Sequence, residues 1–268
     1  MITLADALQI ALLVSVIHMS AYYLLSLVKR DASVVDIGWG LGFVLIAWIL
    51  WGSATEKSLG LNLMVLFVSI WGIRLAWHIT NRKLKAGNVE DWRYQTRREA
   101  WGRQFVGRSY FQIFLLQALL MVVIAMPILV AATNHADFDA SIWLGVGSLV
   151  WLAGFYFEAV GDGQLAKFIA KKNIRKKQAK GKQFMTSGLW AYTRHPNYFG
   201  EVIQWWGLFV MTAGLSNFWW AVLSPLTITF LLLKVTGIPM LEGKYAGDKE
   251  FEKYRRRTNA FFPGPRRK

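Results

Sequence analysis

The stretch FMTSGLWAYTRHPNYFGEVIQW, residues 184–205, decides the fold, because a basic, polar segment turns into an apolar helix within it. Pro196 suits the first turn of a helix, where its missing N–H group is no loss. The helix therefore begins near Pro196. Its free backbone N–H groups, Arg194 and His195 then converge on one point, which suits a phosphate or pyrophosphate group.

A polar stripe follows along the same helix. Asn197, Glu201 and Gln204 are spaced i, i+4 and i+7, which places them on one face of a helix that is otherwise mostly apolar. This face must meet something polar. Two interpretations stay open: a ligand site, or an ordinary helix cap followed by hydrogen bonds between helices.

The motif carries a family resemblance. RHPNYFGE (194–201), preceded by SGLWAYT and followed by FEKYRRRTNAFFPGP (251–265), resembles the C-terminal domain of the steroid 5-alpha-reductase family, most closely its bacterial branch. It is also similar to the sterol C14-reductases. Its R-H-P-x-Y-x-G part alone is similar to isoprenylcysteine and phospholipid methyltransferases. The resemblance covers about residues 150–268.

The composition predicts an integral membrane protein. Of the 268 residues, 54% are hydrophobic, and the mean hydropathy is +0.31. There is no cysteine, and the four His residues show no zinc spacing, so no metal site is expected. The net charge of +15 lies in the connections between apolar runs, which favours contact with membrane lipid headgroups and not with nucleic acid.

Seven apolar runs are long enough to span or nearly span a bilayer. Lys and Arg concentrate in 29–32, 82–108, 161–197 and the tail, whereas 133–141 and 215–216 have none. This asymmetry predicts an all-α protein with seven transmembrane helices, the N-terminus outside and the C-terminus cytoplasmic, in a bacterial-type inner membrane. We expect a single domain, 1–268, whose cofactor site faces the cytoplasm, and a short cytoplasmic helix over 247–257. The runs are 5–28, 33–52, 59–81, 109–132, 142–160, 198–214 and 217–236.

Ionisable residues inside the runs are the leads to catalysis, because an unpaired charge in a span is costly. Arg74 and His78 are one turn apart in the third run, and Asp36 in the second is the natural acidic partner. These three are our candidate catalytic residues, or else a structural ion pair between two helices. The glycines of GWGLGF (38–43) lack a complete dinucleotide fingerprint and suit close helix packing or the approach of a cofactor ring.

The resemblance also implies a cofactor site. Asn197, Glu201, Asp162 and Tyr254 match the family's positions for the nicotinamide cofactor NADPH, and we expect Glu158, one turn before Asp162, to share hydrogen bonds with its hydroxyl or carboxamide groups. The alternative is a helix end with both carboxylates simply solvated. Further candidates for cofactor binding, by charge or place in the motif, are Lys167, Lys171, Arg194, His195 and Tyr198.

Together these features predict a membrane reductase that transfers a hydride from NADPH to an activated C=C bond of a lipophilic, steroid- or isoprenoid-like substrate entering from the bilayer. The adjacent Gln-Glu pair of steroid reductases is missing from the N-terminal half, which argues against a steroid. Two alternatives stay open: an S-adenosylmethionine-dependent methyltransferase of the isoprenylcysteine type, and a non-enzymatic lipid-binding or transport protein. IPMLEGKY (238–245) has one Glu where such methyltransferases have an adjacent pair.

The topology can be tested with reporters. A reporter fused after Lys268 is expected in the cytoplasm, and one inserted at Asp137 is expected outside, because 133–141 carries no Lys or Arg. Activity of a two-sided reporter such as a phosphatase–fluorescent protein pair measures both positions. Both reporters on one side of the membrane would contradict seven spans.

Overall fold

The computed structural model describes residues 2–134, 142–175 and 184–267, and every helix or strand assigned among them is a helix. Asp137 and the basic segment 176–183 lie outside the described residues. The chain divides into two compact units, Met1–Leu144 with Thr212–Ser224, and Gly145–Met211 with Pro225–Lys268. Each is described separately below, and a single domain stays a prediction.

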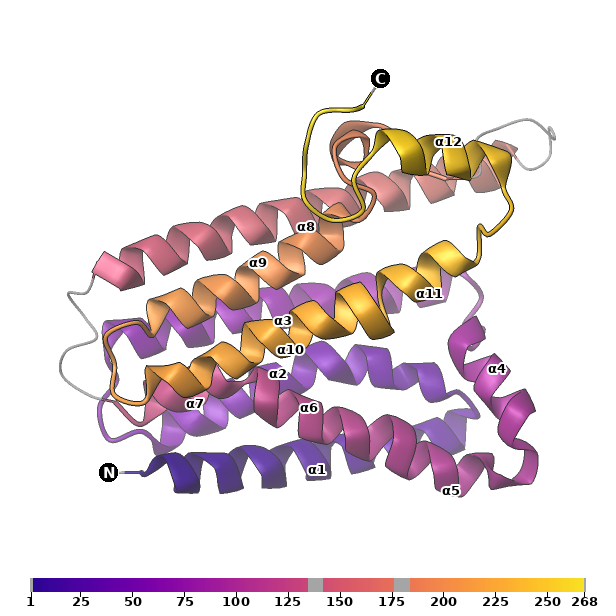
Figure 1. The fold of residues 1–268 in the computed structure, drawn as a ribbon. Coiled ribbons are helices and arrows are strands. Elements are labelled where there is room, and N and C mark those ends of the chain that lie inside the picture. The colour runs from indigo at the N-terminus through magenta and orange to yellow at the C-terminus, as the bar shows by residue number, and fades with distance from the viewer. Residues whose placement is uncertain (1, 135–141, 176–183, 268) are drawn as a thin grey trace. The chain divides into compact units, whose positions relative to one another are not determined.

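The first unit is a bundle of long helices and short helical segments (Figure 1). Its first helix begins with a reciprocal cap in which Thr3 and Asp6 satisfy each other's backbone N–H groups, and it ends at Arg30 in the left-handed conformation. The elements are α1 (Leu4–Lys29), η1 (Ala32–Val34), α2 (Val35–Ser53), α3 (Leu59–Lys85), α4 (Trp92–Trp101), η2 (Gly102–Gln104), α5 (Phe105–Ser109), a π-helical turn (Tyr110–Leu115), α6 (Leu116–Ile124), α7 (Met126–Ala132) and η7 (Phe218–Val222).

Two glycines fix the packing of α2 on α3. A Cβ atom added to Gly40 would lie 2.6 Å from the carbonyl oxygen of Gly72, and one added to Gly72 would lie 2.5 Å from that of Gly40. The two backbones therefore touch, which only glycine permits. Of the two interpretations of GWGLGF, close helix packing is the one that Gly40 shows.

The second unit contains the motif helix. α9 begins at Pro196, which confirms the predicted start, and α12 confirms the predicted short helix before Pro263. Asp248 caps α12 by accepting from two backbone N–H groups. The elements are α8 (Ile142–Arg175), η6 (Gly188–Ala191), α9 (Pro196–Met211), α10 (Leu223–Phe230), a π-helical turn (Leu231–Val235), α11 (Ile238–Gly243) and α12 (Lys249–Arg257); the first residues of α8 and α10 belong to the first unit.

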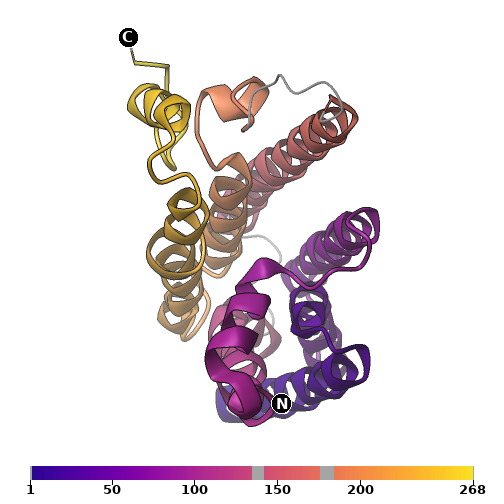
Figure 2. The ribbon, with the colours of Figure 1, turned by 90° about the vertical axis from the view of Figure 1, so that its right-hand side faces the viewer.

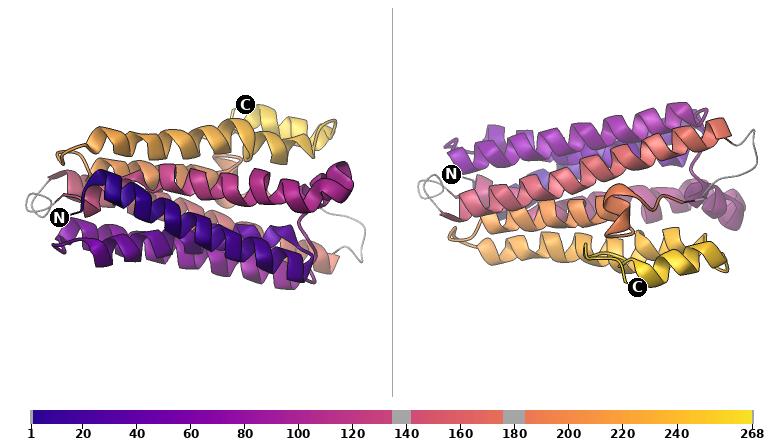
Figure 3. Two further views of the ribbon diagram at one scale, coloured as in Figure 1. Left: turned by 90° about the horizontal axis from the view of Figure 1, so that it is seen from below. Right: turned by 90° about the horizontal axis from the view of Figure 1, so that it is seen from above.

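Helices α8 and α9 run antiparallel and side by side, as Figures 2 and 3 show. Glycines seven residues apart line the contact. A Cβ atom on Gly147 would lie 2.6 Å from the Gly207 carbonyl oxygen, and one on Gly154 would lie 2.6 Å from that of Gly200. Gly161 continues the row against Pro196. This small-residue seam brings the two backbones into contact and sets which side chains meet across it.

Within the part of the chain that the structure describes, six helical segments are long and apolar enough to cross a membrane, as expected of an integral membrane protein. They overlap six of the seven predicted runs, although the segment Trp92–Ile124 begins and ends earlier than the predicted run 109–132. The remaining run, 198–214, corresponds to α9, which has 16 residues and is shorter than the usual span of about 20. The segments are Leu4–Lys29, Ala32–Ser53, Leu59–Lys85, Trp92–Ile124, Ile142–Lys171 and Phe218–Gly243.

The glycine seam predicts a position-specific loss of stability. Gly154→Ala should destabilise the second unit by about 1–3 kcal/mol, because its methyl group collides with backbone atoms that cannot move aside. Gly163→Ala is the matched control on α8, since a Cβ atom there meets nothing within 4 Å. The unfolding midpoint in detergent measures both variants. Equal midpoints would show that the seam does not limit the packing.

Candidate functional site

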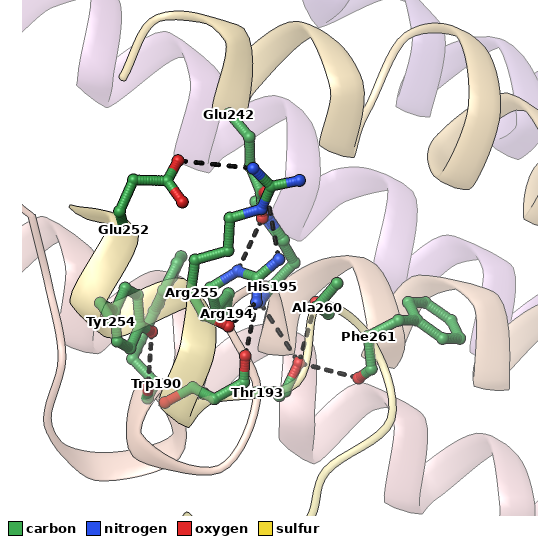
Figure 4. A network of polar contacts seen from close by, with 11 residues as sticks. Trp190, Thr193, Arg194, His195, Glu242, Glu252, Tyr254, Arg255, Ala260 and Phe261 are labelled. Carbon is green, nitrogen blue, oxygen red and sulfur yellow. Dashed lines mark hydrogen bonds and ion pairs between the residues drawn. The ribbon is translucent and has the colours of Figure 1, made fainter. Parts of the chain in front are cut away.

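The motif before α9 forms a buried ion-pair network with α11 (Figure 4). The Arg194 guanidinium donates to both carboxylate oxygens of Glu242, from Nε at 2.8 Å and from Nη2 at 3.1 Å. His195 Nε2 lies 3.0 Å from the same carboxylate. Both basic side chains are buried, so Glu242 supplies the negative charge that makes their burial tolerable.

The rest of the Arg194 side chain is engaged as well. Its Nη1 donates to the carbonyl oxygens of Arg255 at 3.1 Å and Thr258 at 2.5 Å. The predicted contact of Arg194 and His195 with a pyrophosphate would therefore require Glu242 to give them up. In this conformation both side chains are paired with Glu242 inside the protein, so the N-terminus of α9 does not offer them as two free donors to a phosphate.

The C-terminal tail encloses the same motif. Thr193 pairs with Asn259 in an isolated parallel bridge, and its hydroxyl donates to the carbonyl of Phe261 at 2.8 Å. The Tyr254 hydroxyl donates to the Trp190 carbonyl at 2.5 Å, and burial raises the pKa of Tyr254, so it keeps its proton. Tyr254, which the resemblance assigned to the cofactor, thus holds α12 against η6.

Two amide–carboxylate pairs cross from α9 to α8. Asn197 Nδ2 donates to Asp162 at 3.2 Å, and Gln204 Nε2 donates to Glu158 at 2.5 Å. Asp162, Glu158 and Gln204 are buried. The other amide atoms, Asn197 Oδ1 and Gln204 Oε1, are buried acceptors with no donor. An unsatisfied buried acceptor is costly, so each marks a place where a ligand hydroxyl or N–H group would bind favourably.

The remaining predicted cofactor residues of this unit lie around these pairs. Tyr198 is stacked on His195, with ring centroids 5.5 Å apart and planes inclined by 9°. Glu201 is half-buried on α9, one turn from Asn197, while Lys167 and Lys171 are exposed on α8. The structure therefore brings Asn197, Asp162 and Glu158 to one seam and leaves the two lysines in solvent-accessible positions.

In the first unit, Asp36 receives two side chains from α4. Arg93 Nη2 lies 2.5 Å from Asp36 Oδ2, and the Tyr94 hydroxyl donates to Asp36 Oδ1 at 2.7 Å. The sequence prediction named Arg74 and His78 as its partners, and both are half-buried on α3. The structure therefore adds Arg93 and Tyr94 as residues that contact Asp36.

Neighbouring ion pairs hold the loop before α4 in place. Glu90 accepts from the Ala32 backbone N–H at 2.7 Å and from Arg98 at 2.8 Å. Burial alone would raise the pKa of Asp91, but hydrogen bonds and charge from Arg93 lower it below its usual value. Asp91 is therefore an anion that orients Arg93 toward Asp36.

Sequence reasoning does not predict three of the residues in these clusters. It shows Glu242 only as the single Glu of IPMLEGKY, and it does not indicate Arg93 or Tyr94 as partners of Asp36. The spacing of Gly147, Gly154 and Gly161 by sevens was the available signal for the seam. Nothing local in the sequence pairs Glu242 with Arg194, which lies 48 residues earlier.

Comparison with known proteins places the chain in a family. The model of a family described as a protein of unknown function, DUF1295, matches residues 22–258. The chain belongs to this family. The family is related to steroid 5-alpha-reductase-like proteins. No curated protein and no solved structure matches. Among the described residues, no group of three or more His, Asp or Glu could hold a metal ion.

The ion-pair network predicts an asymmetric response to loss of its two acids. Glu242→Ala should destabilise the protein by about 3–5 kcal/mol, because Arg194 would be left buried and uncompensated. Glu252→Ala, which removes a contact 3.4 Å from the exposed Arg255, should cost no more than about 1 kcal/mol. Thermal unfolding in detergent compares them. Equal losses would contradict a buried role for Glu242.

Proposed function

We propose that this protein is a membrane reductase that takes a hydride from NADPH and delivers it to an activated C=C bond of a lipophilic substrate. The observation that carries the proposal is the α8–α9 seam, where buried carboxylates and amides gather and two amide oxygens have no donor. The relation of the family to steroid 5-alpha-reductase-like proteins supports the reaction class.

The seam has the chemistry to hold the polar part of a nicotinamide nucleotide. A carboxamide N–H group or ribose hydroxyl would satisfy Asn197 Oδ1, and Asp162 would accept from a second hydroxyl. Glu201 and Tyr198 lie on the same first turns of α9 and would complete the contacts. NADPH, when bound, supplies the hydride, and the chain supplies orientation and a site shielded from water.

In this proposal, exposed lysines of α8 bind the phosphate groups of NADPH. Lys167 and Lys171 are exposed and lie one turn apart on the helix that carries Asp162. Arg194 and His195 act mainly through Glu242, as positioning residues that fix the start of α9. Because Glu242 already occupies their donors in this conformation, the N-terminus of α9 favours an anionic ligand in this proposal mainly through its helix dipole.

The acid in this proposal is the Tyr94 hydroxyl, with Asp36 and Arg93 as positioning residues. Tyr94 is 4% exposed, so its hydroxyl sits in a dry environment where a hydrogen bond to a developing enolate oxygen is strong. The hydroxyl donates to Asp36 in this conformation, so in the proposed step it would turn to the substrate oxygen and pass its proton there. The nearby Arg93 cation would stabilise the phenolate, and a proton from water would then restore the phenol. Arg74 and His78 stay as candidates for contacts with the substrate on α3.

The proposed topology keeps seven spans. α9, with 16 residues, would be about 24 Å long and would cross as a short, tightly packed span beside α8. The Lys and Arg distribution then places the N-terminus outside and the cofactor side in the cytoplasm of an inner membrane.

Ligand binding distinguishes the reductase proposal from the methyltransferase alternative. Purified protein titrated with NADPH, NADH and S-adenosylmethionine should bind NADPH and show no saturable binding of S-adenosylmethionine. NADPH should bind tighter than NADH by at least ~1 kcal/mol, the scale of one charge-assisted contact to the 2′-phosphate. Lys167→Gln/Lys171→Gln should remove that difference. If the protein binds S-adenosylmethionine and not NADPH, the α8–α9 site belongs to a methyltransferase and the reductase proposal is wrong.

Binding and turnover should separate between the two sets of residues. Asn197→Ala or Glu201→Gln should weaken NADPH binding by about 1–3 kcal/mol, the cost of losing a buried hydrogen bond. Tyr94→Phe and Asp36→Asn should leave NADPH affinity within a factor of a few and lower the hydride-transfer rate roughly 10²-fold. Equilibrium titration and single-turnover measurements on folded protein give the two quantities. A Tyr94→Phe variant with the parental rate would remove Tyr94 as the acid.

A further inference from the structure

The second unit carries a groove that the proposed reductase does not use. Its volume is about 400 Å³ and it is open on one side. One wall comes from Phe157 in the middle of α8, and the others come from η6, the residue after it and the C-terminal tail. The lining residues are Phe157, Leu189, Tyr192, Pro263, Gly264 and Pro265.

The shape of the groove is fixed because hydrogen bonds hold the C-terminal tail opposite η6. The Gly264 N–H donates to the Tyr192 carbonyl at 3.0 Å, and Arg266 Nε donates to the Ala191 carbonyl at 3.3 Å. Ring contacts strengthen the wall, since Phe157 meets Phe199 edge-on with centroids 5.1 Å apart. Apart from backbone groups already engaged, the lining is apolar, which suits a hydrocarbon chain.

Positive charge gathers directly beyond the lining. Arg266 follows Pro265, and Arg267 donates its backbone N–H to the Arg257 carbonyl at 2.9 Å, so the three arginines are neighbours. All three are exposed, and residues 253–267 contain no Asp or Glu. Arg266 and Arg267 use some of their N–H groups on neutral acceptors, the Ala191 carbonyl and the Asn259 amide oxygen. Arg266 also donates to the Thr186 carbonyl, and within the described residues none of these acceptors carries a charge that would compensate the arginines.

The groove also lies beside the end of an apolar run that is expected to span the bilayer. Phe157 is near the end of the apolar run 142–160, and the exposed rings of Tyr192 and Phe262, at 54% and 69%, belong to the same region. Aromatic rings with exposed edges are enriched at this depth. An apolar slot that ends in arginines at this level matches a molecule with a hydrocarbon chain and an anionic phosphate.

We propose that this groove is a binding site for one anionic phospholipid of the surrounding bilayer. An acyl chain lies along Phe157, Leu189 and the two prolines, and the headgroup phosphate meets Arg266 and Arg267. The site does not depend on the reductase proposal, because it shares none of the cofactor residues.

Lipid competition tests the site on the full chain. The protein, delipidated in a neutral detergent, is titrated with phosphatidylglycerol or with phosphatidylcholine of the same acyl chains, and retained lipid is counted by native mass spectrometry. Phosphatidylglycerol should bind roughly tenfold tighter, as expected for two arginines at a membrane surface. Glycerol phosphate, which lacks the chains, should not compete at the same concentrations.

Three variants locate the binding. Arg266→Gln/Arg267→Gln should bring the two lipids within about twofold of each other, whereas Arg266→Lys/Arg267→Lys should keep the preference because the charge remains. Lys249→Gln/Arg256→Gln is the matched control, since it removes two exposed charges of α12 that are not among the lining residues, and it should behave like the natural chain.

The outcomes separate the site from general charge attraction. Equal affinity of the two lipids for the natural chain would overturn the proposal. An equal loss in the Lys249→Gln/Arg256→Gln control would also overturn it, because the preference would then follow net charge. If the glutamine variant does not fold, Leu189→Ser tests the other half of the site, since it should weaken both lipids several-fold and leave their ratio unchanged.

Discussion

The close approach of α8 and α9 is the constraint on which the candidate site depends. Gly154 and Gly200 let the backbones touch, so the polar side chains one turn away have no space to turn elsewhere. Gln204 therefore reaches Glu158, and Asn197 reaches Asp162. In an apolar environment these groups cannot exchange a lost partner for water, so the geometry of the seam fixes the hydrogen bonds.

The Arg194–Glu242 pair has a different role from the one expected of a cation at a helix N-terminus. Its two parallel hydrogen bonds, with further donation to backbone carbonyls, use most of the guanidinium's donors inside the protein. A buried pair of this kind adds little net stability compared with apolar packing, but losing one partner is costly. It therefore specifies how α11 and the tail meet the start of α9.

The Asp36 cluster shows how a loop completes a helical site. Asp36 begins α2, yet the groups that bind it come from α4, 57 and 58 residues later. The loop is held by Glu90 through Ala32 and Arg98, so Tyr94 is positioned by a chain of ion pairs. In the proposed reaction, this arrangement keeps the phenol oriented at little entropic cost when substrate arrives.

The sequence by itself determined the helical class, six of the seven predicted apolar segments as helices long enough to cross a membrane, the start of α9 at Pro196 and the short α12, because hydrophobic runs and caps act locally. It also singled out Asp36, because a polar residue in an apolar run is visible without a fold, and Asn197 through its spacing with Glu201 and Gln204, whereas Asp162 came from the family resemblance. Only the tertiary structure decided their partners. Arg93 for Asp36 and Glu242 for Arg194 lie dozens of residues away, and many acids and bases could have paired in their place. The acid or base that forms each pair depends on backbone contacts such as that of Gly154 with Gly200. These contacts exist only once the helices have packed.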